Sequence, residues 1–351
     1  MGKSRQKPAL AGGLPALLEA LADQLDQLRP SSELVNRAVS LLESTPPSRF
    51  VEIDRQIRDL GRLYHHRYLP DGRLGGWLRL LAHSNRKTGP SADLVMLNHQ
   101  PALAPIFLSH GDGRVREAAL DHLTEINAPY IVCAIALRLN DWAGPVRYAA
   151  LECADRLLGA TSPTVLAEAA MEILPRRSTW TRGDKALLRL DAAFAQPDVV
   201  QAIVNLLAVS TTGPCLRVLA EASRTDAVDT WLEHLASKAA QPNVRALAYR
   251  FLIEGEAAWP EGFEHVWIDK TYGMKRRIRR YGHRSLSITS DRANLIAAAT
   301  KDRAAAVRLT VADSLIRHRH GLPDPAGLAE TLSHDKHPGV RLRAQFVLDN
   351  V

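Results

Sequence analysis

A nine-residue motif recurs along the chain from residue 115 onward. It consists of a Val-Arg pair, a small or branched apolar residue four positions after the Val, and another apolar residue four positions later. Five copies begin at Val115, Val146, Val244, Val307 and Val340. These offsets place the residues on one face of a helix, and a small middle residue lets a neighbouring helix approach closely. The motif therefore predicts repeated, closely packed helices.

The spacing of the copies defines the repeating unit. A degenerate sixth copy begins at Leu216. Successive copies then begin either roughly 30 residues apart or about twice as far apart, and the shorter spacing is long enough for two short helices and their turns. We expect the two longer intervals, from Val146 to Leu216 and from Val244 to Val307, to hold about two repeats each.

An acidic residue lies six positions before the Arg in three copies, namely Asp141 before Arg147, Asp302 before Arg308 and Asp335 before Arg341. The segments NDWAGPVRYAALECA, TKDRAAAVRLTVADSL and SHDKHPGVRLRAQFVL resemble HEAT repeats, especially the short bacterial HEAT-like type. The resemblance implies antiparallel helix pairs in a right-handed superhelical stack, with Asp and Arg of adjacent repeats forming a ladder. The first copy departs from the pattern, because His110 holds the position six before Arg116.

The predicted fold class is therefore all-α. We expect an α-solenoid of HEAT-like helix pairs over residues 101–351 and a helical N-terminal region over residues 1–100, which lacks the motif and is either divergent repeats or a cap. Helices in that region are expected over residues 14–28, 31–42, 51–69 and 74–81, and residues 84–91 are the best linker. Because the chain shows no long alternation of apolar and polar residues, strands should be few.

Composition indicates a cytoplasmic protein. The cysteines form no CxxC pair and are expected to be reduced and buried; they are Cys133, Cys153 and Cys215. No run of 18 apolar residues is present, so no membrane span is expected. After a basic tail, the helical spacing of the leucines between Leu14 and Leu25 favours an amphipathic first helix over a signal peptide.

The sharpest local feature is a basic segment, KTYGMKRRIRRYGHR, over residues 270–284. We expect a helix here, because Met274, Ile278 and Tyr281 recur at helical spacing. Forked cations on a rigid support suit phosphates or an acidic protein surface, whereas the alternative is a solvated face paired with acids elsewhere. The candidate binding residues are Lys270, Lys275, Arg276, Arg277, Arg279, Arg280, His283 and Arg284.

The function predicted from these features is a non-catalytic interaction scaffold that binds a protein partner on its solenoid, an acidic surface being the partner that the basic segment suits. No catalytic residue, metal site or cofactor is predicted. The repeated arginines are expected to be structural, as is the segment from Arg317 to His320, whose cations suit a helix C-terminus. The pair Asp141 and Trp142 is expected to pack in a repeat turn.

The alternative is a nucleic-acid-binding protein, with or without enzymatic activity. Trp180 and Asp184 are four residues apart, and Arg217 follows about one repeat later. This arrangement is similar to that of the HEAT-like alkylpurine DNA glycosylases. The resemblance implies an Asp near the sugar of a damaged nucleotide and aromatic residues that hold the duplex, provided that Trp180 and Asp184 share one helical face.

Overall fold

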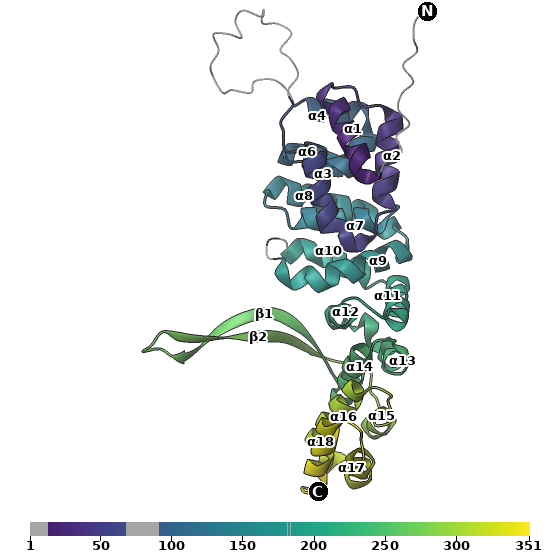
Figure 1. Ribbon diagram of the computed structural model, residues 1–351, viewed down its shortest axis with the longest axis vertical. Coiled ribbons are helices and arrows are strands. Elements are labelled where there is room, and N and C mark those ends of the chain that lie inside the picture. Colours follow the sequence, from purple (N-terminus) through teal and green to yellow (C-terminus); the bar gives the residue numbers. More distant parts are fainter. Residues whose placement is uncertain (1–12, 68–90, 181, 183) are drawn as a thin grey trace, which may run out of the picture. The chain divides into compact units, whose positions relative to one another are not determined.

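The computed structural model describes residues 13–67, 91–180, 182 and 184–351, with side chains omitted at 184–186. The described chain is mostly helical and contains one two-stranded sheet (Figure 1). It divides into two compact units, one formed by residues 1–169 and 181–190 and the other by residues 170–180 and 191–351. The change of sequence pattern at residue 100 therefore lies inside the first unit.

The described residues of the first unit form helices that are joined mostly by turns and 3₁₀ segments. The helices are α1 Leu14–Asp26, α2 Ser32–Glu43, α3 Phe50–Leu60, α4 Ala92–His99, α5 Ala104–Phe107, α6 Gly113–His122, α7 Pro129–Leu139 and α8 Gly144–Leu157. The boundary between the units passes through α9 Pro163–Ile173 and α10 Asp184–Phe194. The second unit adds α11 Pro197–Val209, α12 Cys215–Ala222, α13 Leu232–Lys238, α14 Pro242–Glu254, β1 Glu256–Asp269, β2 Met274–Ser285, α15 Arg292–Ala299, α16 Ala305–His318, α17 Pro325–Ser333 and α18 Pro338–Leu348.

The N-terminal helices largely follow the prediction. Helix α1 buries its leucines, and the Ser31 hydroxyl caps α2 by accepting a hydrogen bond from the Leu34 amide. The helix expected over residues 51–69 is too long, because α3 ends at Leu60 and Arg62 adopts a left-handed conformation with φ 53°. The helix expected over residues 74–81 and most of the linker at 84–91 lie outside the described residues.

The Val-Arg motifs form α6, α8, α14, α16 and α18, as the sequence predicts. The Val of each copy is buried, and so are the small or branched residues at the middle position. In the first unit α8 packs against α6 and α7, and in the second unit α14 packs against α13 and α16, and α18 against α16 and α17. The motif face is therefore the face that joins neighbouring helices.

In three of the five copies, the Arg of the motif forms a fork that joins successive helix pairs; these are Arg116, Arg245 and Arg308. Arg116 donates from Nη1 to the backbone oxygens of His110 and Gly111 at 2.7 and 3.0 Å. Its Nε and Nη2 bind the carboxylate of Asp141 at 3.0 and 2.9 Å. The same arrangement recurs where Arg245 binds Asp302 at 2.8 and 2.9 Å. A bidentate bond of this kind fixes both distance and orientation.

The partner Asp also orders its own turn. Asp141 and Asp302 each accept a hydrogen bond from the amide two residues later, at 3.0 and 2.8 Å. Asp335 repeats this bond and pairs with Arg308, whose hydrogen bond holds the pKa of that carboxyl below its ordinary value. The first copy of the motif has His110 in place of the Asp. Its Nδ1 accepts a hydrogen bond from the Asp112 amide at 2.9 Å, so it makes the same contact with the turn.

The sequence predicted two repeats in the interval between Val244 and Val307. The structure has only one repeat there, and a two-stranded insertion accounts for the extra length. Arg245 pairs directly with Asp302, 57 residues later, whereas Arg308 and Asp335 are 27 residues apart. The two strands and their turn occupy residues 256–285. Without this segment, Arg245 and Asp302 would have the same separation in sequence as the uninterrupted pair. The sheet is therefore inserted between α14 and α15, in the connection between two successive helix pairs.

Replacing a buried residue of the motif by an acid should disrupt the stacking of α18. We expect Ala344→Glu to lower the free energy of unfolding by about 3 kcal/mol or more, because Ala344 is 0% exposed and the new carboxylate has no partner. Leu342→Glu on the same helix is the matched control, since Leu342 is 72% exposed. Thermal unfolding followed by circular dichroism measures both, and equal melting temperatures would contradict the packing of this face.

Candidate functional site

The sequence predicted a helix for the basic segment at 270–284, and this prediction is wrong. The segment forms the turn and the second strand of a hairpin. β2 pairs antiparallel with β1 along its whole length, and the hairpin extends away from the helices of its own unit (Figure 1). Gly255 ends α14 with φ 71°, and Gly273 closes the hairpin turn with φ 66°. Its apolar residues have helical spacing, but the segment pairs with β1 instead. β1 is rich in aromatic and branched residues, which favour strands.

The root of the hairpin is fixed to the helices by packing and by ion pairs. β1 contacts α12 and α14, Trp259 is only 8% exposed, and the Arg224 guanidinium lies 5.3 Å from the centre of its ring. Arg284 binds both carboxylate oxygens of buried Asp229, at 2.6 and 2.8 Å, and donates to the backbone oxygens of Ser223 and Thr225. Arg284, predicted as a contact residue, is therefore an anchor.

Asp229 collects the hydrogen bonds that hold this root. Besides Arg284, its carboxylate accepts from the amide and hydroxyl of Ser287 at 2.8 and 3.1 Å. Burial raises the pKa of the Asp229 carboxyl, but the hydrogen bonds from Arg284 and Ser287 outweigh this effect and leave the pKa below its ordinary value. The anchor is therefore ionised and fully formed at neutral pH.

One face of the hairpin interleaves aromatic rings with cations. Directly opposite residues share a face of an antiparallel pair, and the register joins Phe263 to Arg279, His265 to Arg277 and Trp267 to Lys275. These six residues are called the aromatic–basic face. Lys275 Nζ lies 4.0 Å from the centre of the Trp267 ring, and the guanidiniums of Arg277 and Arg279 lie 3.7 and 5.4 Å from that of Phe263.

Cation–π contacts hold these charged groups in place without neutralising them. Among the described residues, no ion pair to an acid is found for Lys275, Arg277 or Arg279. All six residues of the face are exposed to solvent. The face therefore presents three fixed cations, each two residues from the next along β2.

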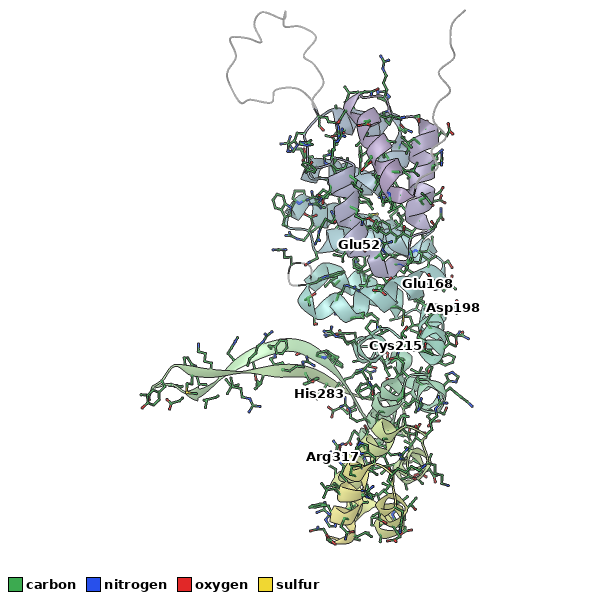
Figure 2. All side chains as sticks on the ribbon, viewed as in Figure 1. Glu52, Glu168, Asp198, Cys215, His283 and Arg317 are labelled. Atoms are coloured by element: carbon green, nitrogen blue, oxygen red, sulfur yellow. The ribbon has the colours of Figure 1, made fainter. Side chains whose placement is uncertain are left out.

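The opposite face of the hairpin is more mixed. Arg276 lies across from Val266, and Ile278 lies across from Glu264. Arg280 on this face forms an ion pair with Glu261 at 3.2 Å. Nearer the root, His283 lies on the same side as Arg279 and pairs with Glu256 at 2.5 Å. Side chains stand out on both sides of the hairpin in Figure 2, where His283 marks the root. Part of the charge outside the aromatic–basic face is thus already compensated.

The structure brings together five of the eight predicted residues as exposed cations of one strand, namely Lys275, Arg276, Arg277, Arg279 and Arg280. Lys270 lies in the turn, and His283 and Arg284 lie at the root. The three rings of β1 were missed. Their signal is the alternation Phe263, His265, Trp267, which is too short to stand out from the surrounding repeats.

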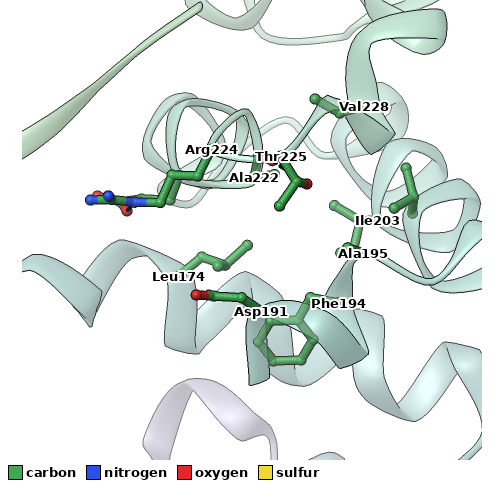
Figure 3. A pocket seen from close by; sticks show the side chains of 11 residues that line it. Leu174, Asp191, Phe194, Ala195, Ile203, Ala222, Arg224, Thr225 and Val228 are labelled. Carbon is green, nitrogen blue, oxygen red and sulfur yellow. Dashed lines mark hydrogen bonds and ion pairs between the residues drawn. The ribbon is translucent and has the colours of Figure 1, made fainter. Parts of the chain in front are cut away.

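A small cavity lies in the second unit and is lined in part by Ala222 of α12 (Figure 3). It measures about 30 Å³, far below the roughly 300 Å³ of ordinary ligand sites, and is lined largely by apolar residues such as Leu174, Phe194 and Ile203. Its acids are already paired, Glu221 with Arg224 at 2.8 Å and Asp191 with Arg177. Burial raises the pKa of Glu221, opposed by Arg224. The cavity is a packing defect rather than a site.

The geometry required by the glycosylase alternative is not found. Trp180 follows a 3₁₀ segment over residues 174–179, and α10 begins only at Asp184, so the two residues do not share a helical face. The expected packing of Trp142 is also wrong. Asp141 is buried in its ion pair, but the Trp142 side chain is 72% exposed, and Arg147 contacts only the backbone oxygen of that residue.

Other candidate groups have structural partners. Arg317 and His318 both pair with Glu254, at 3.0 and 2.9 Å. The three cysteines are buried, and burial raises the pKa of the Cys153 thiol to about 11. In the described part of the chain, no group of three His, Cys, Asp or Glu residues is close enough to hold a metal ion.

No helix within the described ranges is, by itself, both long and apolar enough to cross a membrane. Comparison with known proteins adds no family assignment. No protein-family model matches the chain, and neither does any curated protein. The function must therefore be argued from the geometry of the site, since a helical fold alone does not define one.

Removing the charge of the anchor should destabilise the hairpin root. We expect Asp229→Asn to lower the free energy of unfolding at pH 7 by about 3 kcal/mol, because Arg284 loses its buried counter-charge. A carboxyl with a lowered pKa stabilises the fold above its unfolded pKa and loses this effect as the pH falls through its folded pKa. The difference from wild type should therefore shrink below about pH 4.

Urea unfolding at pH 7 and pH 3 measures this effect. Asp226→Asn is the matched control, because Asp226 belongs to the same 3₁₀ segment and is exposed. A difference that stays constant with pH would show that the Asp229 charge does not carry the anchor.

Proposed function

We propose that the protein binds nucleic acid, without catalysis, through the aromatic–basic face of its inserted hairpin. The observation that supports this most is the row formed by Lys275, Arg277 and Arg279, held at strand spacing by the rings of Phe263 and Trp267. A polyanion with regularly spaced charges is the partner that such a row fits.

The spacing favours a phosphodiester backbone. Alternate residues of a strand are about 6.7 Å apart. This is close to twice the roughly 3.4 Å of axial rise between phosphates on one strand of duplex DNA. The cations along β2 are therefore spaced on the same scale as the charges of a nucleic-acid backbone.

Preorganisation favours binding further. A long Arg or Lys side chain loses rotamer freedom when it binds, which costs about 0.5–1.5 kcal/mol for each side chain ordered. On this face the cation–π contacts have already restricted Lys275, Arg277 and Arg279. Arg also donates several hydrogen bonds in a plane, which suits phosphate oxygens.

We further propose that each compact unit is a stack of HEAT-like helix pairs that carries this binding element. The support is the recurring fork in which Arg116 binds Asp141, Arg245 binds Asp302 and Arg308 binds Asp335. This is the ladder that the resemblance implies. In this view the helices supply a rigid base, and the hairpin supplies the contact.

An acidic protein surface, the partner that the sequence favoured, remains the alternative occupant. Its carboxylates would contact the same cations, so salt dependence alone does not separate the two. It offers no regular charge spacing to match the row along β2, and this is why nucleic acid is the preferred partner.

The decisive variant removes two cations from the aromatic–basic face. We expect Arg277→Gln/Arg279→Gln to weaken binding to a short fluorescent DNA duplex about tenfold at moderate salt. The slope of log affinity against log salt should fall by about two, because each lost phosphate contact removes about one released counterion. Fluorescence anisotropy at several salt concentrations measures both quantities.

Arg276→Gln/Arg280→Gln is the matched control. It removes the same charge from the same strand, but Arg276 and Arg280 lie on the opposite face and Arg280 is already paired with Glu261. Equal losses in both variants would attribute binding to net charge rather than to this face. No binding of wild type at low salt, together with capture of an acidic protein, would overturn the proposal in favour of the scaffold.

A further inference from the structure

The tip of the hairpin carries an apolar group that the phosphate contact does not use. Tyr272 is 81% exposed, more than any other large apolar side chain of the described residues. Ile268 and Met274 flank it and are 61% and 53% exposed. Lys270 lies two residues before Tyr272 in the sequence, and Lys275 directly follows Met274. The tip therefore combines one projecting ring with nearby cations.

This tip is held rigidly. The Asp269 carboxylate accepts hydrogen bonds from the amides of Thr271 and Tyr272, at 2.7 and 3.2 Å. The Gly273 amide donates to the backbone oxygen of Lys270 at 3.3 Å, and Gly273 supplies the left-handed φ of 66° that closes the turn. The ring of Tyr272 thus projects from a backbone that the turn itself holds in place.

We propose that Tyr272 is a stacking site for an unpaired nucleobase, reached when the aromatic–basic face lies along the phosphate backbone. The inference rests on the proposed nucleic-acid binding and specifies its preferred substrate, a duplex that contains an unpaired base. An aromatic ring stacks on any base, because every base offers a π face. Apolar side chains that flank such a ring serve as a wedge between bases.

An unpaired base is favoured over an intact base step for an energetic reason. Separating two stacked base pairs costs a few kcal/mol, and the cost is least where a base is already unpaired. A single ring with two flanking apolar side chains offers a small apolar area to offset that cost. The tip is therefore suited to detecting an existing defect rather than to creating one.

A lipid surface suits the tip less well. Binding to a membrane scales with the apolar area that is buried, and the three apolar side chains are interrupted by Asp269, Lys270 and Thr271. The shaft below them also carries exposed Glu264. One base requires only one ring, which is what the tip presents.

The test uses the full chain and two DNA duplexes that differ only in one unpaired 2-aminopurine. We expect wild type to bind the bulged duplex on the order of tenfold more tightly than the perfect one and to quench the fluorescence of the 2-aminopurine. Tyr272→Ala should lose both effects while keeping its affinity for the perfect duplex. Tyr272→Phe should retain both, because stacking requires the ring and not the hydroxyl.

Thr271→Ala is the control for the turn and should behave as wild type, since Thr271 carries no ring and its bond to Asp269 comes from the backbone amide. Binding of both duplexes with equal affinity would overturn the stacking site and leave nucleic-acid binding intact. Binding of neither would overturn both proposals. A lipid surface would replace the nucleobase as the ligand under one combined result. Wild type would bind phosphatidylserine vesicles, Tyr272→Ala would not, and wild type would not quench 2-aminopurine in DNA.

Discussion

The buried fork between Arg and Asp is the interaction on which the helical units depend. In each instance one guanidinium joins the backbone of its own turn to the carboxylate of the next pair, as Arg116 does with Asp141. Two planar groups joined by two hydrogen bonds fix a distance and an angle together. Apolar burial supplies most of the stabilisation, but it is not directional. The fork provides the registration that such burial lacks.

The sequence predicted the helical part well, because its signals are local and repeated. Valines such as Val146 and small residues such as Ala150 recur at helical offsets, and both are buried. Aspartates six residues before the Arg marked the turns. His110 shows the limit of the pattern, since its ring nitrogen replaces a carboxylate oxygen in the same backbone contact, a substitution that spacing alone does not reveal.

The candidate site was predicted in composition but not in geometry. The cations of β2 were found by counting charge, whereas their conformation depends on a partner strand whose signal is short. Met274 and Ile278 are spaced four apart, which fits a helix as well as one face of a strand. The pairing of Arg284 with Asp229, 55 residues away in sequence, could not be predicted, because no local pattern encodes a contact of that range. The long-range ion pair with Asp229 is what makes Arg284 an anchor, whereas the other cations of β2 stay exposed.

The way in which the hairpin joins the helices gives it independence. Its first and last residues, Glu256 and Ser285, are paired across the sheet, and the Leu286 amide donates to the Gly255 oxygen at 2.9 Å. The chain therefore leaves the helices after α14 and returns at nearly the same point before α15. A hairpin of any length that starts and ends at this point connects α14 and α15 in the same way as a tight turn would. The hairpin is free to lengthen, shorten or change its side chains in evolution while the helices that carry it stay the same.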